Sequence, residues 1–372
     1  MEMFPVIELS GGAFERGRIH GERARERVER SVANYAGLFA FVGMEWQEAQ
    51  RRSAPYRDVI GAFDASLLEE MEGIARGAGR PFSEILALNS RTEVLPPSFL
   101  TGVDAGECTA IAVSPAASAT GGTLLAQNWD WVGSQREALV VLRVRETEAP
   151  ACLTLTEAGM LAKIGLNAAG LGVCLNILRS VFDGKGIGIP VHVLLRALLK
   201  RSSVRDAVDF AGRLSFGGSS NILMADRSGD AASLEFSPKG LRVVRGEGAT
   251  LCHTNHFLHP EAKAWQATHV PNLSTLPRLE RALFHAAARP KQGVEDMKRL
   301  LRDESDGLLS ISRNPDRSLP PEAQIESVAS VIMELARGVM HIAPDVPTRA
   351  DYEPVALASD GEVALAQRRV AV

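Results

Sequence analysis

The arrangement of apolar residues changes abruptly at Cys108, in a chain of 372 residues. Residues 1–100 carry apolar side chains at the three- to four-residue spacing of amphipathic helices. A connector rich in proline and glycine, residues 96–107, follows them. From Cys108 onward the chain consists of short apolar runs separated by turns, which is typical of strands. The sequence therefore predicts a helical N-terminal segment, 1–107, and a strand-rich segment, 108–372.

The order of the predicted elements after Cys108 indicates an architecture. Strands come first, then two helices, further strands, a helical region and two last strands. The glycines at 121–122 indicate a hairpin between the first two strands. Strands interrupted by paired helices favour two sheets between helical layers, a mixed α/β (α+β) fold of four layers in the order αββα. The expected strands cover 108–114, 123–130, 139–145, 152–158, 162–167, 170–178, 219–229, 231–238, 241–248, 250–257, 326–336 and 339–345, and the expected helices 189–202, 203–214 and 275–305.

Charge and hydropathy argue against two large classes of partner. The net charge is -4 and the pI about 6.1, whereas contacts with nucleic-acid phosphates need a basic surface. No apolar run approaches the roughly 20 residues that span a bilayer. The acidic N-terminus also lacks the basic and apolar regions of a signal peptide. We therefore expect a cytoplasmic protein with no nucleic-acid or membrane partner, and the sequence leaves the oligomeric state open.

The four cysteines are far apart and form no C-x-x-C pair. Cys152 and Cys174 lie in apolar, strand-like runs, where cysteine is usually a small buried hydrophobe. Cys252 opens the stretch CHTNHFLHP, which raises the alternative of a metal site, but the spacing matches no zinc motif and no second ligand cluster is present. The glycines at 184–190 lack the Ser/Thr and helix start of a phosphate-binding loop. We expect neither a metal nor a cofactor.

Cys108 is the cysteine whose surroundings suggest chemistry. A nucleophilic thiol needs a base, and the candidate histidines His192, His253 and His256 are distant in sequence. Cleavage between Glu107 and Cys108 would supply a different base, the free α-amine of Cys108. An α-amine titrates at about 7.7–8.0, close to the pH at which a general base is most effective. The thiol itself can make this cut by attacking the preceding carbonyl in an N-to-S acyl shift, after which the thioester is hydrolysed.

The motifs around Cys108 resemble those of a known family. ECTAIAV followed by GGTLLAQNWDW is similar to the penicillin acyltransferase type of N-terminal-nucleophile hydrolases, the acyl-coenzyme A:6-aminopenicillanic acid acyltransferase family of cysteine peptidases. Further matching stretches are LNAAGLGVCLNIL, SSNILMADRSGDAASLEFSP, HTNHF, ESVASVIMEL with HIAPDVP, and the N-terminal GRIHGERARERV and EMEGIARGAG. The resemblance covers most of the chain and implies an αββα fold with a helical pro-segment.

The resemblance also implies roles for three residues. Cys108 matches the self-processing residue and mature nucleophile. Asp130 matches the acidic residue near the nucleophile's amine, where a carboxylate stabilises the ammonium form; otherwise it is a polar residue at a strand end. Asn255 matches the oxyanion-hole asparagine; without the resemblance, it is interpreted as a polar residue in a turn at a strand end. Residue 107 is glutamate where the best-known member has glycine, a difference that bears on the rate of the acyl shift.

A fourth site residue of the family is an arginine late in the chain. Arg313, in LLSISRNPDR, is the preferred match and Arg317 is a rival. Either is a plain surface arginine if the match fails. Asn176 and Asn221 lie in matched stretches, and Asn128 belongs to the QNWD element. We expect these three asparagines to support the site from behind.

The predicted function is a self-processing cysteine amidohydrolase or acyltransferase. It forms an acyl-enzyme on Cys108 from a small amide, peptide or thioester, and the arginines at 300–317 favour an acidic substrate or a coenzyme A thioester. The fragments 1–107 and 108–372 are expected to stay associated after the cut. Two alternatives stay open: an uncut relative that binds a small amide or peptide without turnover, and an uncut enzyme with a Cys–His pair.

Overall fold

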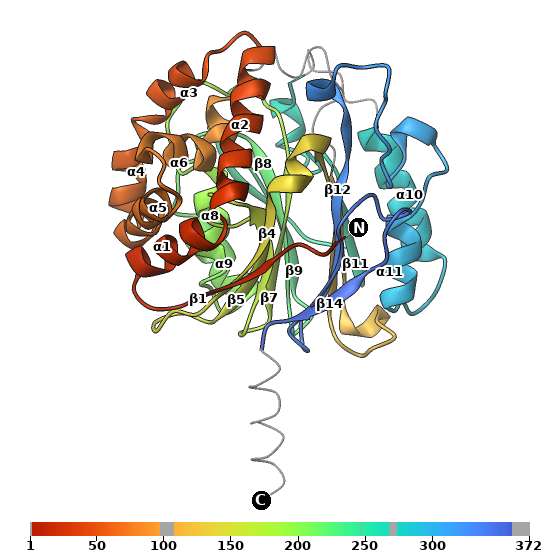
Figure 1. The fold of residues 1–372 in the computed structure, drawn as a ribbon. Coiled ribbons are helices and arrows are strands. Elements are labelled where there is room, and N and C mark those ends of the chain that lie inside the picture. Colours follow the sequence, from red (N-terminus) through yellow and green to blue (C-terminus); the bar gives the residue numbers. More distant parts are fainter. Residues whose placement is uncertain (1, 97–107, 247, 268–273, 359–372) are drawn as a thin grey trace, which may run out of the picture.

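Two β-sheets stacked face to face form the centre of the molecule, and helices cover the outer face of each sheet (Figure 1). The computed structural model describes residues 2–96, 108–246, 248–267 and 274–358. Within these ranges one sheet has eight strands and the other has six. The predicted four-layer αββα sandwich is therefore confirmed. None of the helices in these ranges is both long and apolar enough to cross a membrane.

The eight-stranded sheet includes a strand that was not expected from the sequence. β1 (Val6–Leu9) lies in the segment predicted to be helical, and it pairs in parallel with β4 at one edge of the sheet. A run of four residues is too short to show a clear period, so its partner strand decides its conformation. The other neighbouring pairs are antiparallel. In spatial order the strands are β1, β4 (Leu139–Val144), β5 (Cys152–Glu157), β6 (Ile164–Asn167), β7 (Leu171–Ile177), β8 (Ser220–Asp226), β9 (Ala231–Ser237) and β10 (Gly240–Val244).

The six-stranded sheet carries the start of the strand-rich segment at its centre. Its second and third strands form the predicted antiparallel hairpin. The predicted strand at 250–257 ends earlier, at His253, because the chain turns there after pairing with Ala110. A last strand at 353–356 was not expected. In spatial order the strands are β11 (Thr250–His253), β2 (Thr109–Val113), β3 (Leu124–Val132), β12 (Ile325–Glu334), β13 (Val339–Ala343) and β14 (Glu353–Ala356).

Two groups of helices form the outer layers (Figure 1). The N-terminal helices, with α8 and α9, lie on the side of the eight-stranded sheet, and α10 and α11 lie on the side of the six-stranded sheet. The predicted helices at 189–202, 203–214 and 275–305 are present as α8, α9 and the pair α10 and α11. The helices are α1 (Ala13–Arg23), α2 (Arg25–Phe41), α3 (Trp46–Ser53), α4 (Tyr56–Phe63), α5 (Ala65–Ala78), α6 (Phe82–Asn89), α7 (Arg91–Val94), α8 (Val191–Leu198), α9 (Val204–Ala211), α10 (Thr275–Ala287) and α11 (Val294–Leu301).

Glycines bring α1 and α5 unusually close together. Gly17 and Gly21 on α1 face Gly73 and Gly77 on α5, at four-residue spacing on both helices. A Cβ atom at any of these positions would collide with backbone atoms of the facing helix. Because only glycine permits such an approach of two backbones, these residues fix how α1 lies on α5.

A buried polar network joins the N-terminal helices to the strand-rich segment. The hydroxyl of Tyr35 donates to Oε1 of Glu157 on β5 at 2.6 Å, and Nη2 of Arg91 donates to the same oxygen at 3.3 Å. Arg196 on α8 forms a second buried ion pair, with Glu70 on α5, at 3.4 Å. Breaking a buried ion pair leaves an uncompensated charge and costs about 3–5 kcal/mol. The two segments are therefore held together by side chains as well as by the pairing of β1 with β4.

His20 on α1 makes the stability of this junction depend on pH. Its Nε2 accepts a hydrogen bond from the N–H of Gly159 at 3.1 Å, and burial lowers its pKa to about 4 from an ordinary 6.5. Protonation therefore favours the unfolded chain, so the free energy of unfolding falls as the pH drops from 6.5 towards 4. We expect His20 to account for a loss of about 2 kcal/mol between pH 7 and pH 5. Urea unfolding of the wild type and His20→Gln at equal protein concentration measures it; equal losses in both proteins would contradict this role.

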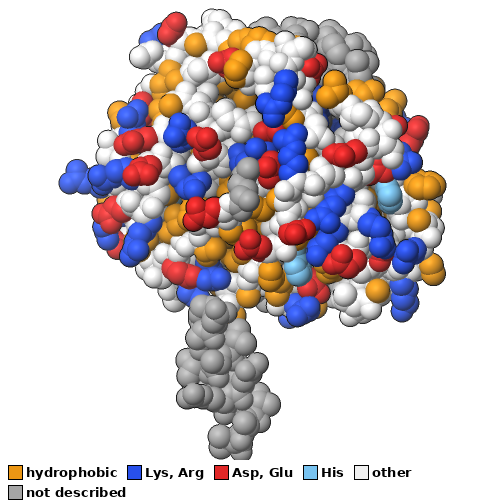
Figure 2. Space-filling view, turned by 45° about the vertical axis from the view of Figure 1, so that its right-hand side comes forward, with side chains coloured by type: hydrophobic (Ala, Val, Ile, Leu, Met, Phe, Trp, Pro, Cys, Tyr) orange, Lys and Arg blue, Asp and Glu red, His pale blue; other side chains and the backbone are white. Residues whose placement is uncertain are grey.

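Charges of both signs are mixed on the face that Figure 2 shows, where lysine and arginine side chains alternate with aspartate and glutamate. On and beside α11, side chains of opposite sign form ion pairs. Lys298 pairs with Glu295 at 2.7 Å, and Arg302 pairs with Asp351 at 3.1 Å. This face presents no extended area of a single charge.

Candidate active site

Cys108 lies immediately before β2, the strand that pairs with β11 on one side and β3 on the other. Its side chain is buried in the core cluster that also contains Ala110 and Ala112, between the two sheets. Since successive strand residues point to opposite faces, Thr109 points the other way, towards α10, where Arg278 donates to its hydroxyl at 3.0 Å. The predicted nucleophile thus lies at the end of a central strand, with different partners on its two sides.

Side chains from three other elements hold the backbone of Cys108. Its N–H donates to Oδ1 of Asn255 at 2.9 Å. Its carbonyl oxygen accepts two hydrogen bonds, from Nδ2 of Asn176 at 3.0 Å and from Nη1 of Arg278 at 2.7 Å. The nitrogen and the carbonyl of one residue are therefore both fixed by side-chain groups, which is unusual at a strand end because most such groups bond to backbone or water. Glu107, the other residue of the predicted cleavage site, lies outside the described residues.

Asn255 reaches Cys108 because β11 ends two residues earlier. Its backbone N–H donates to Oγ1 of Thr275, at the start of α10, at 2.9 Å. Its Nδ2 donates to the carbonyl of Ile177, the last residue of β7, at 2.9 Å, and Arg278 Nη2 donates to its Oδ1 at 3.1 Å. These contacts orient the amide with its oxygen towards the nitrogen of Cys108.

Asp130 lies on β3, the strand that forms a hairpin with β2, which begins directly after Cys108. An irregularity in the pairing of β3 with β12 places Ser327 opposite it, and the Ser327 hydroxyl donates to Oδ1 of Asp130 at 2.6 Å. The other oxygen, Oδ2, is buried and has no hydrogen-bond partner within the described ranges. Burial raises the pKa of Asp130 to about 7, although the charges of Arg278 and Arg313 oppose the shift. A buried carboxylate with a raised pKa is typical of functional sites.

Of the two candidate arginines, Arg313 is the one that lies beside Asp130. Its backbone N–H donates to Oγ of Ser327 at 3.0 Å, the hydroxyl that contacts Asp130, and its side chain is buried. Arg317 is exposed. The geometry therefore favours Arg313 over its rival.

The three supporting asparagines have different positions. Asn176 contacts the Cys108 carbonyl directly, and Asn221 donates to Oδ1 of Asn176 at 3.1 Å. Asn128 instead donates to the carbonyls of Leu301 and Ile311, both at 2.8 Å. It ties β3 to the outer helical layer, so its contacts are structural.

Arg278 and Lys163 belong to the site but were not expected from the sequence. Arg278 is fully buried on α10, and it contacts both Cys108 and Asn255. Lys163 is also buried; its Nζ lies 3.6 Å from the ring centroid of Trp129 and 3.6 Å from Oε2 of Glu157. Neither residue belongs to a motif around Cys108, and a charged residue in an apolar segment is the only sequence signal for Lys163.

The Cys108 thiol is strongly disfavoured as a thiolate in this setting. Burial, followed by the negative charge of Asp130, raises its pKa to about 12. Lys163 and Arg278 oppose the shift with their positive charges. A thiol with such a pKa does not ionise by itself near neutral pH, so its reaction requires a base beside it.

The candidate histidines have other partners. Both ring nitrogens of His253 are engaged: Nε2 lies 2.8 Å from Oε1 of Glu235, and Nδ1 lies 2.7 Å from the carbonyl of Thr254. His192 is buried with Nδ1 facing the carbonyl of Ala162, and burial holds its pKa well below the usual range. The hydrogen-bond partners of Cys108 in the described part of the chain include no histidine. The described residues also hold no group of three or more metal-ligating side chains.

Two stacked sheets between helical layers, with a cysteine opening a central strand, define the fold of the N-terminal-nucleophile hydrolases. The chain belongs to the acyl-coenzyme A:6-aminopenicillanic acid acyl-transferase family, whose model matches residues 118–343. It is 31% identical over 258 residues to the acyl-coenzyme A:6-aminopenicillanic-acid-acyltransferase 40 kDa form of Emericella nidulans, covering 68% of this chain and 69% of the relative.

Solved structures match this chain at much lower identity. A variant of the conjugated bile acid hydrolase from Clostridium perfringens matches with a TM-score of 0.50 and 14% identity, covering 67% of this chain and 92% of that protein. Penicillin V acylase from Agrobacterium tumefaciens matches with a TM-score of 0.46 and 17% identity, covering 64% of this chain and 83% of that one.

Proposed function

We propose that this protein is a self-processing cysteine amidohydrolase or acyltransferase that cuts itself between Glu107 and Cys108. The observation that carries the proposal is the hydrogen bond from the nitrogen of Cys108 to Asn255 Oδ1. This nitrogen is a peptide N–H in the continuous chain and becomes the α-amine after the cut. A side chain that already holds it places the future base next to its thiol.

The cut proceeds by an acyl shift. Sγ of Cys108 attacks the carbonyl carbon of Glu107, the C–N bond breaks, and the proton lost by the thiol passes to the leaving nitrogen of Cys108. Water then hydrolyses the resulting thioester, which leaves a carboxylate on Glu107 and a free thiol and amine on Cys108. Arg278 and Asn176 hold the Cys108 carbonyl during this step, so the residue keeps its position while one of its bonds is exchanged.

Turnover uses the same groups. The α-amine removes the thiol proton, and Sγ attacks the substrate carbonyl to form a tetrahedral intermediate. Nδ2 of Asn255 and backbone N–H groups stabilise the oxyanion. The ammonium then protonates the leaving amine, or the leaving thiol of a thioester, and water or an amine releases the acyl group from Cys108.

Asp130 and Arg278 set the electrostatics of these steps. The unsatisfied oxygen of Asp130 accepts a hydrogen bond from the new ammonium group, which stabilises the charged form of the amine. Arg278 donates to Asn255 Oδ1 and so keeps the orientation of that amide while its other end binds the oxyanion. Arg313 supports Asp130 through Ser327.

The fragments 1–107 and 108–372 remain associated in this proposal. β1 stays paired with β4 in the sheet, and the contacts of Tyr35 and Arg91 with Glu157 join the two fragments inside the core. No cofactor takes part, and the substrate is a small amide, peptide or thioester, with a coenzyme A thioester among the options.

N-terminal sequencing of the purified protein tests the proposal. We expect a second N-terminus that begins Cys-Thr-Ala-Ile-Ala, together with release of carboxylic acid from members of an N-acyl amide panel. Pretreatment with iodoacetamide is expected to abolish this release by alkylating Cys108. A single N-terminus after prolonged incubation would favour an uncut relative that binds its ligand without turnover.

A further inference from the structure

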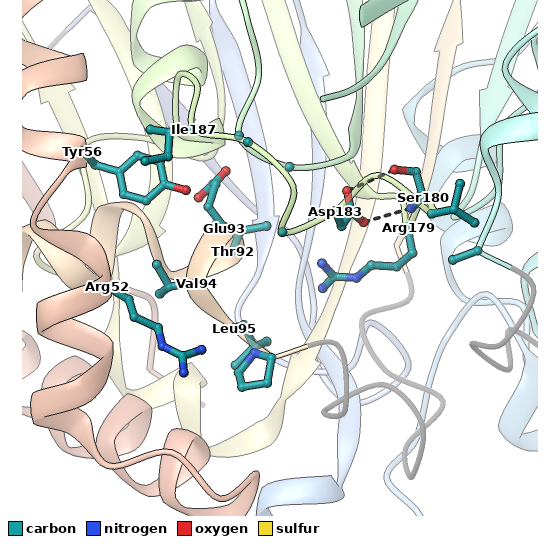
Figure 3. Close-up of a pocket in the computed structure, with 17 residues that line it drawn as sticks. Arg52, Tyr56, Thr92, Glu93, Val94, Leu95, Arg179, Ser180, Asp183 and Ile187 are labelled. Atoms are coloured by element: carbon teal, nitrogen blue, oxygen red, sulfur yellow. Dashed lines mark hydrogen bonds between the residues drawn. The ribbon is translucent and has the colours of Figure 1, made fainter. Parts of the chain in front are cut away.

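A cavity of about 330 Å³ opens between the N-terminal helices and the loop that follows β7 (Figure 3). Its walls include Tyr56 and Leu95 on one side and Val181 and Ile187 on the other. A volume of this size accommodates a small organic molecule. The mixture of apolar walls with a few charged groups is typical of such sites.

One wall of the cavity belongs to a chain segment that also contacts the Cys108 site. Asn255, which holds the nitrogen of Cys108, donates from Nδ2 to the carbonyl of Ile177. Arg179, two residues further along the same segment, lines the cavity. On the opposite wall, Leu95 and Pro96 are the last described residues before the connector that leads to Cys108.

Arg179 has a guanidinium group that forms no ion pair with the residues that the structure describes. It is partly buried, and none of its nitrogens donates a hydrogen bond to the described residues; Nε is fully buried. Figure 3 shows Arg179 and Arg52 reaching towards the middle of the cavity from opposite sides. Arg52 pairs with Glu48 through Nε at 2.8 Å, which leaves its terminal nitrogens facing the cavity. A partly buried cation without a partner costs free energy unless a ligand supplies the counter-charge.

The acidic groups of the cavity, Asp183 and Glu93, attract Arg179 through their charge, but their carboxylate oxygens are engaged by other donors. Asp183 is occupied by the N–H of Ser180 at 2.9 Å and by the hydroxyl of Ser219 at 2.5 Å. Glu93 accepts a hydrogen bond from the N–H of Val191 at 2.8 Å, and burial raises its pKa to about 7. Neither carboxylate forms an ion pair with Arg179 within the described ranges, so the guanidinium stays available to an incoming anion.

We propose that this cavity binds the carboxylate group of an acid-bearing amide substrate, with Arg179 as its main partner and Arg52 as a second cation. This inference rests on the proposed function, because it assigns the cavity to the substrate of Cys108. A carboxylate fits better than a phosphate, since Glu93 and Asp183 in the same walls repel a dianion more strongly than a monoanion. The apolar walls hold the carbon skeleton next to the charged group.

Two probes that contain no amide test this binding without interference from turnover. They are 4-phenylbutyrate and its neutral analogue 4-phenyl-1-butanol, titrated by calorimetry into the wild type, Arg179→Met and Arg205→Met. Arg205 is an exposed arginine on α9 that does not line the cavity. We expect the wild type and Arg205→Met to bind the carboxylate about 10- to 100-fold more tightly than the alcohol, as a charge-assisted hydrogen bond allows. In Arg179→Met this preference is expected to fall below threefold, with the affinity for the alcohol unchanged.

Three results would overturn the inference: equal affinity of the wild type for both probes, a preference that persists in Arg179→Met, or no binding of either probe. None of them bears on the proposed function, which is decided separately by the second N-terminus. If the protein is not cut but still prefers the carboxylate probe, the result supports the anion site and rules out the self-processing nucleophile.

Discussion

The Cys108→Ala variant is expected to remain one full-length chain, whereas the wild type separates on denaturation into fragments 1–107 and 108–372. Alanine has no Sγ to attack the Glu107 carbonyl, so the acyl shift cannot begin. Neither uncatalysed hydrolysis of this peptide bond nor cleavage by a contaminating protease depends on this one atom. Intact-mass measurement of both denatured proteins gives the answer directly, and turnover of any amide should be lost together with the cut, since the same sulfur forms the acyl-enzyme.

Cys252→Ala provides the matched control. Cys252 is also buried, and it lies on β11 opposite Ile111 of β2, close to Cys108 in the same sheet. Its removal perturbs packing to a similar extent, so this variant is expected to be cut like the wild type. Cleavage of the Cys108→Ala chain at the same bond, or a wild type that stays intact, would rule out the proposed self-processing.

Asn255→Ala is expected to lower turnover by about 10²–10³-fold, the usual cost of losing one oxyanion-hole donor. The substitution removes Nδ2 as the oxyanion donor and Oδ1 as the acceptor that holds the nitrogen of Cys108. Slower cutting is expected as well, because that nitrogen is the leaving group of the acyl shift. The cut fraction is measured first by intact mass, and the rate of acid release is then expressed per cut molecule, which separates processing from turnover.

Asn128→Ala is the matched control for this measurement. Asn128 is, like Asn255, a buried asparagine, and its amide holds the carbonyls of Leu301 and Ile311 rather than any atom of Cys108. We expect it to lower stability while the rate per cut molecule stays within tenfold of the wild type. A loss below tenfold in Asn255→Ala would show that Asn255 is a structural residue.

The helix that carries Arg278 shows why part of the site was hidden from sequence reasoning. Leu276, Leu279, Leu283 and Phe284 are the large apolar residues of α10, and an apolar stripe is expected to face the core. In the structure Leu276, Leu283 and Phe284 are exposed and only Leu279 of these four packs against the core. The buried residues of the helix are Thr275, Arg278 and Ala282. The polar atoms of Cys108, Thr109 and Asn255 lie beneath α10 and need a donor, so hydrogen bonding decided the inward face of this helix against the hydrophobic pattern.

Local patterns in the sequence by themselves determined the two-part organisation of the chain, most of its strands and helices, and the hairpin that brings Cys108 next to the QNWD element. These features depend on periods of two and 3.6 residues and on turn residues, all of which act over a few neighbouring positions. Only the tertiary structure decided that β1 joins the sheet, that Asn255, Asn176 and Arg278 meet at Cys108, and that Arg179 faces a cavity. Such contacts join residues that are 68 to 170 positions apart, and no local period carries information about a partner at that separation.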